Sequence, residues 1–173
     1  MTDTRGNGAG LPEGQGGSDA AAPPPGMAIN IQYVKDLSFE VPGAPDIYTQ
    51  VRQAPQVQVN LDVNARRVAD NAFEVVLSIR AEAKVEDKTC FIVELDYAGV
   101  FTLTSVPQEM VEPVLLVEAP RMLFPFARSI VSDVTRESGF PAVLLQPIDF
   151  LALWQSRRGQ AAANTNPPPA ANA

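Results

Sequence analysis

The sequence predicts an α+β domain: a four-stranded antiparallel sheet with one long helix and a shorter C-terminal helix packed on one face. Two observations support this prediction. Apolar and polar residues alternate along four segments before residue 100, as they do in strands with one buried and one solvated face. The last part of the chain has the three- and four-residue apolar spacing of a helix. Strands followed by helices are typical of an α+β fold with the helices on one face of the sheet.

The strands are placed by their alternation of period two. The four segments are Ile29–Val41, Val57–Val63, Phe73–Val85 and Phe91–Tyr97. Four half-buried strands of this kind favour an antiparallel sheet. Along the first segment, the alternation predicts an inward face made of Ile29, Ile31, Tyr33, Leu37, Phe39 and Val41.

Turn-forming residues indicate how the strands are connected. Glu86-Asp87-Lys88 predicts a short turn between the third and fourth strands, and Asn64–Asn71 predicts a longer polar loop between the second and third. The proline-rich stretch Val41–Pro55 predicts a crossover segment. We also expect a β-bulge at Gly99, because a glycine inside a strand commonly marks one.

The helical part lies within Val117–Phe150. Pro120 suits the first position of a helix, where its missing N–H costs nothing, and Gly139 can take the left-handed conformation that ends one. Pro125 lies near the first turn and predicts a local kink. One face of this helix is apolar and is interpreted as core or subunit interface; its residues are Leu123, Phe126, Ala127, Ile130, Val131 and Val134.

The composition argues against several classes of function. The 173 residues contain one domain, which we place at 28–158, and carry a net charge of −7, whereas a nucleic-acid partner favours a basic surface. No histidine is present, which removes His-activated nucleophiles and most catalytic zinc sites. Cys90 is the only cysteine, so there is no internal disulfide, as in a reducing compartment. We expect neither a metal nor a cofactor.

The two ends of the sequence are of low complexity. Residues 1–27 and 159–173 have few large apolar side chains, so we expect both to be disordered. The N-terminal part lacks the basic and apolar regions of a secretory signal. The apolar run Val114–Val117 is too short to span a membrane. We therefore expect a cytoplasmic protein without direct membrane insertion.

Acidic residues gather on the outward phase of the predicted strands: Asp36, Glu40, Glu74, Glu82, Glu94 and Asp96. Three interpretations stay open at this point. The residues form an ordinary solvated face, or an acidic docking surface with Ile92 as an apolar contact, or paired carboxylates for acid–base catalysis. Catalysis is the least favoured, because an open sheet face offers no pocket to shift carboxyl pKa values.

Three separated segments resemble the SecB family of bacterial protein-export chaperones, in the expected order. They are IQYVKDLSFEVPGAP at Ile31–Pro45, FEVVL at Phe73–Leu77 and LFPFARSIVSDVTRESGFPAVLLQPIDF at Leu123–Phe150. The resemblance implies an ATP-independent chaperone that binds unfolded precursor proteins and delivers them to the SecA motor. It also implies a homotetramer, built as a dimer of dimers. A chaperone for a dedicated client, such as an antitoxin, is the alternative, and a small enzyme of this fold is the least favoured.

The resemblance also implies functional residues in three groups. SecA docking corresponds to positions Asp36, Glu40, Ile92 and Glu94. The client groove corresponds to Ile47, Tyr48, Val57, Val59, Phe150, Leu153 and Trp154. Subunit association corresponds to Val93, Leu95 and Tyr97 on the fourth strand, together with Leu123, Phe126 and Ile130 on the long helix.

Overall fold

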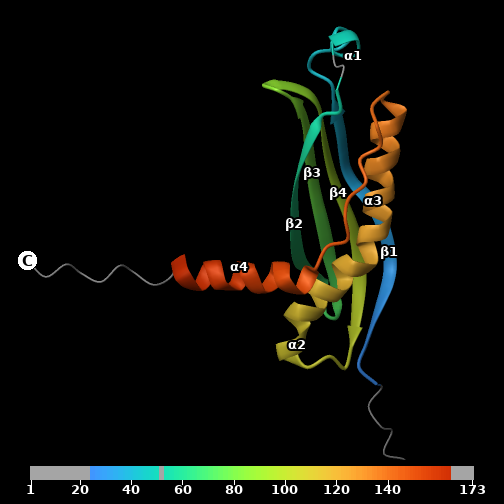
Figure 1. The fold of residues 1–173 in the computed structure, drawn as a ribbon. Helices are drawn as coiled ribbons and strands as arrows, with labels where there is room; N and C mark the ends of the chain where they lie inside the picture. The colour runs from blue at the N-terminus through green and yellow to red at the C-terminus, as the bar shows by residue number, and fades with distance from the viewer. Residues whose placement is uncertain (1–23, 51–52, 165–173) are drawn as a thin grey trace, which may run out of the picture.

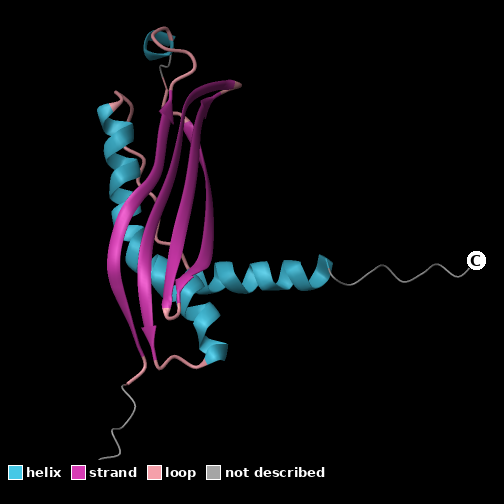
Figure 2. Cartoon of the chain, turned by 180° about the vertical axis from the view of Figure 1, so that it is seen from behind, coloured by secondary structure: helices cyan, strands magenta, loops and turns pink. Residues whose placement is uncertain are grey.

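A single antiparallel sheet with helices on one side forms the domain, as predicted (Figures 1 and 2). The computed structural model describes residues 24–50 and 53–164. The strands are β1 (Gly26–Glu40), β2 (Gln56–Ala69), β3 (Ala72–Val85) and β4 (Lys88–Thr104). They lie in the order β1-β4-β3-β2, so β1 and β2 are the two edges of the sheet.

The second strand is longer than predicted, and the expected polar loop Asn64–Asn71 is wrong. β2 continues through Ala69 and stays paired with β3, leaving Asp70 and Asn71 as the turn. Polar residues fit this part of the strand because side chains on both of its faces have partners there. Arg66 lies opposite Glu74, and the Arg67 guanidinium lies 5.9 Å from the centre of the Phe73 ring. The expected turn between β3 and β4 is present, with Val85 paired to Lys88.

Strand β1 does not keep one alternation along its length. Its register against β4 shifts at Asn30 and again at Lys35, so that each is an extra residue. An extra residue in one strand reverses the faces of the side chains that follow. Ile31 and Tyr33, predicted to point inward, therefore lie on the outer face, opposite Val100 and Ala98.

Gly99 does not mark a bulge. It is paired in register with Gln32 on β1 and with Val75 on β3. Its role is to let the helix approach the sheet, because a Cβ atom at this position would lie 2.9 Å from both Leu123 Cδ2 and Phe101 Cε2. Such a distance is too short for ordinary packing.

The helical run begins at Gln108, earlier than the predicted start at Pro120. It consists of α2 (Gln108–Pro113), a π-helical segment (Val114–Glu118) and α3 (Ala119–Glu137), which follow one another directly. Pro120 has no N–H to donate, and its ring crowds the preceding turn of the helix. The wider π-helical segment just before Pro120 accommodates both effects. Gly139 follows α3 with a φ of 84°, which confirms its predicted role as a helix stop.

The last helix projects from the domain. An extended segment, residues 140–149, which we call the strap, runs back along the helical side of the sheet (Figure 1). It leads into α4 (Phe150–Asn164), whose far end points away from the sheet. Helix α4 continues six residues beyond the domain boundary expected at residue 158, and residues 1–23 and 165–173 lie outside the described part. No helix among the described residues is long and apolar enough to cross a membrane.

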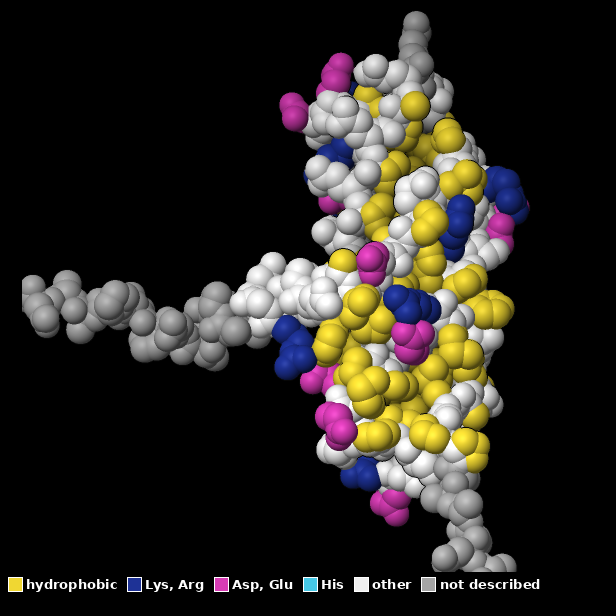
Figure 3. Space-filling view, turned by 60° about the horizontal axis from the view of Figure 1, so that its bottom comes forward, with side chains coloured by type: hydrophobic (Ala, Val, Ile, Leu, Met, Phe, Trp, Pro, Cys, Tyr) yellow, Lys and Arg dark blue, Asp and Glu magenta, His cyan; other side chains and the backbone are white. Residues whose placement is uncertain are grey.

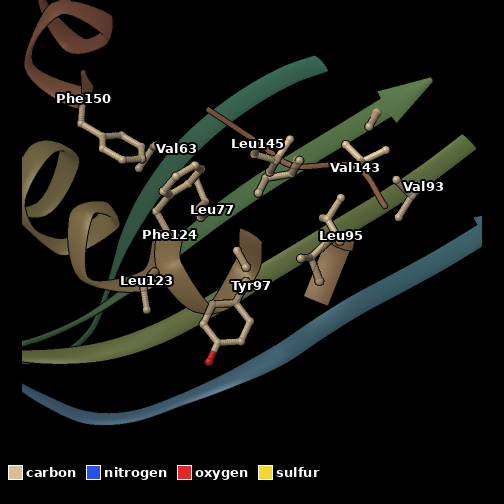
Figure 4. Close-up of a cluster of buried hydrophobic side chains, with 14 of the residues drawn as sticks. Val63, Leu77, Val93, Leu95, Tyr97, Leu123, Phe124, Val143, Leu145 and Phe150 are labelled. Carbon is tan, nitrogen blue, oxygen red and sulfur yellow. The ribbon is translucent and has the colours of Figure 1, made fainter. Parts of the chain in front are cut away.

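The core lies between the sheet and α3. Val93, Leu95 and Tyr97 from β4 and Leu123 from α3 are buried there within one protomer (Figure 4). These four are predicted to serve subunit association, and a single protomer already buries them. Phe126 is 48% exposed and Ile130 is partly buried, so these two remain at or near the surface.

Candidate functional site

An apolar groove lies between the inner face of β2 and the strap. Its volume is about 480 Å³. Figure 3 shows hydrophobic side chains gathered on this side of the molecule, around the base of α4. The side chains that line the groove are almost all aliphatic or aromatic: Ala54, Pro55, Val57, Val59, Leu61, Phe91, Phe124, Pro141, Ala142, Val143, Leu144, Leu145, Gln146 and Ile148.

A second hollow extends the groove toward the crossover segment. It has a volume of about 300 Å³ and is lined by Tyr48, Gln53, Ala54, Pro55, Gly139, Phe140 and Pro141. Ala54, Pro55 and Pro141 line both hollows, so the two adjoin each other. Tyr48, from α1 (Ile47–Gln50), forms one wall, where its ring packs against Phe140 at 5.0 Å between centroids. From here on, the apolar groove means both hollows.

The strap forms the outer wall of the apolar groove, and its side chains alternate between buried and exposed positions. Val143 and Leu145 point inward and are buried, whereas Leu144 is 62% exposed. The strap is held by a buried hydroxyl, since the backbone N–H of Val143 donates to Oγ1 of Thr135 at 3.0 Å. At the end of α3, the Tyr48 hydroxyl donates to the carbonyl of Ser138 at 2.9 Å. The crossover segment, α3 and the strap are thus joined at this end of the groove.

The predicted groove residues divide into three groups. Val57, Val59 and Tyr48 line the apolar groove. Ile47 and Phe150 do not, because they are buried in the core with 4% and 1% of their surface exposed. Leu153 and Trp154 are partly buried at the base of α4 and do not line the groove either; Trp154 Nε1 donates to Glu112 at 3.0 Å.

Sequence reasoning missed the strap as a wall of the groove. From the sequence, a helix end is predicted at Gly139, and no groove residue is assigned between there and Phe150. The available signal was the short apolar run Ala142–Leu145 between Pro141 and Pro147, because a short apolar run bounded by prolines is consistent with a buried extended segment.

Six carboxylates cover the middle of the opposite, outer face of the sheet. Three cross-strand rows hold them: Glu82 beside Ile92 and Glu40, Glu94 beside Ser38, and Asp62, Asp96 and Asp36 in the third row. We call this surface the acidic face. It contains all four residues predicted for SecA docking, and the strand register brings them together: Asp36, Glu40, Ile92 and Glu94.

The prediction for Glu74 is wrong in one respect: the residue was expected to be exposed with the other acidic residues, and it is buried. Its side chain lies on the outer face but is only 2% exposed. Lys35 Nζ lies 3.0 Å and Arg66 Nε 2.5 Å from Glu74 Oε2, and the Tyr33 hydroxyl donates to Oε1. The Tyr33 hydrogen bond, together with Arg66 and Lys35, lowers the pKa of Glu74 to about 2, against the opposing effect of burial. Tyr33 reaches this site only because of the register shifts in β1.

The described part of the chain contains no cluster of His, Cys, Asp and Glu side chains arranged to hold a metal ion. An aliphatic trough along a strand, flanked by an extended strap, suits a segment of polypeptide better than a small polar molecule. The fold and the groove thus define a polypeptide-binding protein.

The comparison with known families identifies which one. A family model described as preprotein translocase subunit SecB matches residues 20–161, and the chain belongs to the SecB family. A relative from Granulibacter bethesdensis, named protein-export protein SecB, is 62% identical over 148 residues, covering 81% of this chain and 85% of its own. A relative of the same name from Acidiphilium cryptum is 57% identical over 149 residues, covering 78% of this chain and 90% of its own.

A solved structure shows the same fold at low sequence identity. It is a Mycobacterium tuberculosis SecB-like chaperone in complex with a peptide from an antitoxin, with a TM-score of 0.58 and 17% identity. The match covers 70% of this chain and 90% of that one. At this identity the likeness supports the fold alone.

Proposed function

We propose that this protein is an ATP-independent chaperone that binds unfolded precursor proteins in the apolar groove and delivers them to SecA for export. The observation that carries the proposal is the groove itself, an open aliphatic trough on the surface of a folded domain. Folded clients bury their apolar side chains, whereas unfolded ones expose them. A groove that contacts apolar side chains along an extended segment therefore selects unfolded chains without needing a sequence motif.

Export is favoured over service to one dedicated client. The relatives that match most of this chain at 57% and 62% identity are named protein-export proteins. The acidic face also retains every residue that the family resemblance associates with SecA docking. A chaperone dedicated to an antitoxin would have the groove but no need for the acidic face.

The groove assignment predicts that Val59→Asp weakens binding of an unfolded client about tenfold, because a carboxylate in an apolar trough loses hydration without gaining a partner. Val68→Asp is the matched control. Val68 lies on the same strand with nearly the same exposure, 43% against 42%, but outside the groove. The measurement is the affinity for a secretory precursor diluted from urea, with the folded mature form as competitor.

Two results would contradict the groove assignment. One is equal client affinity in Val59→Asp and Val68→Asp. The other is capture of the folded form as efficiently as the unfolded one. Circular dichroism on both variants checks that the substitutions leave the fold in place.

The acidic face is proposed as the docking site for SecA. We expect Glu40→Lys to weaken SecA binding about fivefold at low salt and much less at high salt, because exposed charges are screened. Glu109→Lys is the control: it makes the same charge change at an exposed glutamate in the first turn of α2. Equal SecA affinity in the two variants, measured across a salt series, would place docking elsewhere.

The proposed working form is a homotetramer in the cytoplasm, assembled as a dimer of dimers. Its support is an exposed apolar strip on the helical side of the sheet. Phe126 and Met122 on α3 and Val34 and Leu37 on β1 are all at least 40% exposed. A contiguous apolar strip on a soluble domain commonly marks an interface between proteins.

A further inference from the structure

Arg80 stands at the centre of the acidic face. In the strand register it lies between Asn60 on β2 and Glu94 on β4, in the middle of the three rows that hold the six carboxylates. The twelve outward positions of these rows are all described, and Arg80 is the only cation among them. A hollow on this face is lined by Arg80 together with Asp36, Asp62, Glu94 and Asp96.

The guanidinium of Arg80 is already paired. It donates to Glu94 Oε1 through Nη1, and its Nη2 lies 3.8 Å from Glu82 Oε2. Glu82 has a second cation, Lys84, at 2.9 Å, and this hydrogen bond is the main cause that lowers the pKa of Glu82. Among the ion pairs of the described residues, Glu94 has Arg80 alone.

A carboxylate paired within its own sheet is less available to a docking partner. A cation that binds Glu94 must compete with Arg80 or share the carboxylate with it, and it also approaches the positive charge of Arg80 at the centre of the rows. Glu94, one of the residues proposed for docking, is therefore already paired with Arg80 in the free protein.

We propose that Arg80 limits the affinity of the acidic face for a cationic partner by occupying Glu94 in the free protein. The proposal rests on the docking function given above and adds a built-in competitor to it. Arg80 also offsets the repulsion among the neighbouring carboxylates, so the same residue that holds back docking supports the sheet.

The test compares Arg80→Gln with wild type in binding purified SecA at low and high salt. We expect Arg80→Gln to bind about two- to fivefold more tightly at low salt, the size of an exposed ion pair, with a steeper loss of affinity as salt rises. Arg121→Gln is the matched control. It removes the same charge from a side chain of similar exposure, 45% against 42%, that pairs with Glu118 on the helical side of the sheet.

A double-variant cycle locates the effect. If the gain comes from release of Glu94, it should disappear when Arg80→Gln is combined with Glu94→Gln. Equal affinities of Arg80→Gln and Arg121→Gln, weaker binding by Arg80→Gln, or a gain that persists without Glu94 would each overturn the proposal. Glu40→Lys distinguishes failure of the docking proposal from failure of the Arg80 proposal. If it also leaves SecA affinity unchanged, the docking face itself is misplaced, whereas loss of affinity in Glu40→Lys with no gain in Arg80→Gln removes only the role of Arg80.

Discussion

Leu123→Ala is expected to lower the free energy of unfolding by about 3 kcal/mol, within the usual range for removing a fully buried leucine. Leu123 has no exposed surface and packs against the backbone at Gly99, where no side chain can move in to fill the space. The loss should be the same at every protein concentration, because the side chain lies inside the subunit. Urea unfolding at a series of concentrations measures it.

Phe126→Ala provides the contrast from the same helix. Phe126 is about half exposed and stacks on Tyr97 with 6.3 Å between ring centroids. If it belongs to a subunit interface, its removal should shift the sizing profile toward smaller species and make the apparent stability depend on concentration. A concentration-dependent loss in Leu123→Ala instead would show that Leu123 acts across subunits, against its burial here.

Glu74→Gln is expected to cost about 2 kcal/mol of stability at neutral pH and to flatten the acid side of the stability curve. The folded pKa of Glu74 is lowered from 4.5 to about 2. As the pH falls, the unfolded chain therefore takes up a proton first, so the stabilisation is full above about pH 5 and is lost by about pH 2. The expected magnitude is below the full linkage value, because Lys35 and Arg66 are partly exposed to screening solvent.

Denaturant unfolding between neutral and acid pH tests this prediction. Wild type and Glu74→Gln should differ at neutral pH and converge as the pH approaches 2. Glu137→Gln is the control, because its side chain is 78% exposed at the end of α3. Parallel curves for wild type and Glu74→Gln over the whole range would mean that the buried carboxylate contributes nothing to acid stability.

The strand pattern and the helix stop were predictable from local sequence. The alternation in β3 runs without a shift against β2 and β4 from Phe73 to Ala83, so a period of two describes it well. Gly139 signals its own conformation, because few other residues take a positive φ easily. These are features that neighbouring residues determine by themselves.

The remaining features depend on partners far away in the chain. The shifts at Asn30 and Lys35 are set by pairing with β4. A prediction from alternation alone does not detect them, so it assigns Ile31 and Tyr33 to the wrong face. The burial of Glu74 depends on Tyr33, Lys35 and Arg66, contributed by two other strands. The groove was only half predictable, because Val57 and Val59 come from a clear strand, whereas the strap has no regular secondary structure and packs by tertiary contact.

Arg157 has a consequence for solubility. A free sheet edge is a template on which other extended chains can stack, and a protein that collects unfolded chains brings such partners close to its own edges. On the β2 edge, Arg157 of α4 pairs with Asp62 at 2.5 Å and donates to the carbonyl of Leu61 at 3.0 Å. The middle of α4 thus interrupts the β2 edge partway along its length, which leaves shorter stretches on which fibril-like growth can begin.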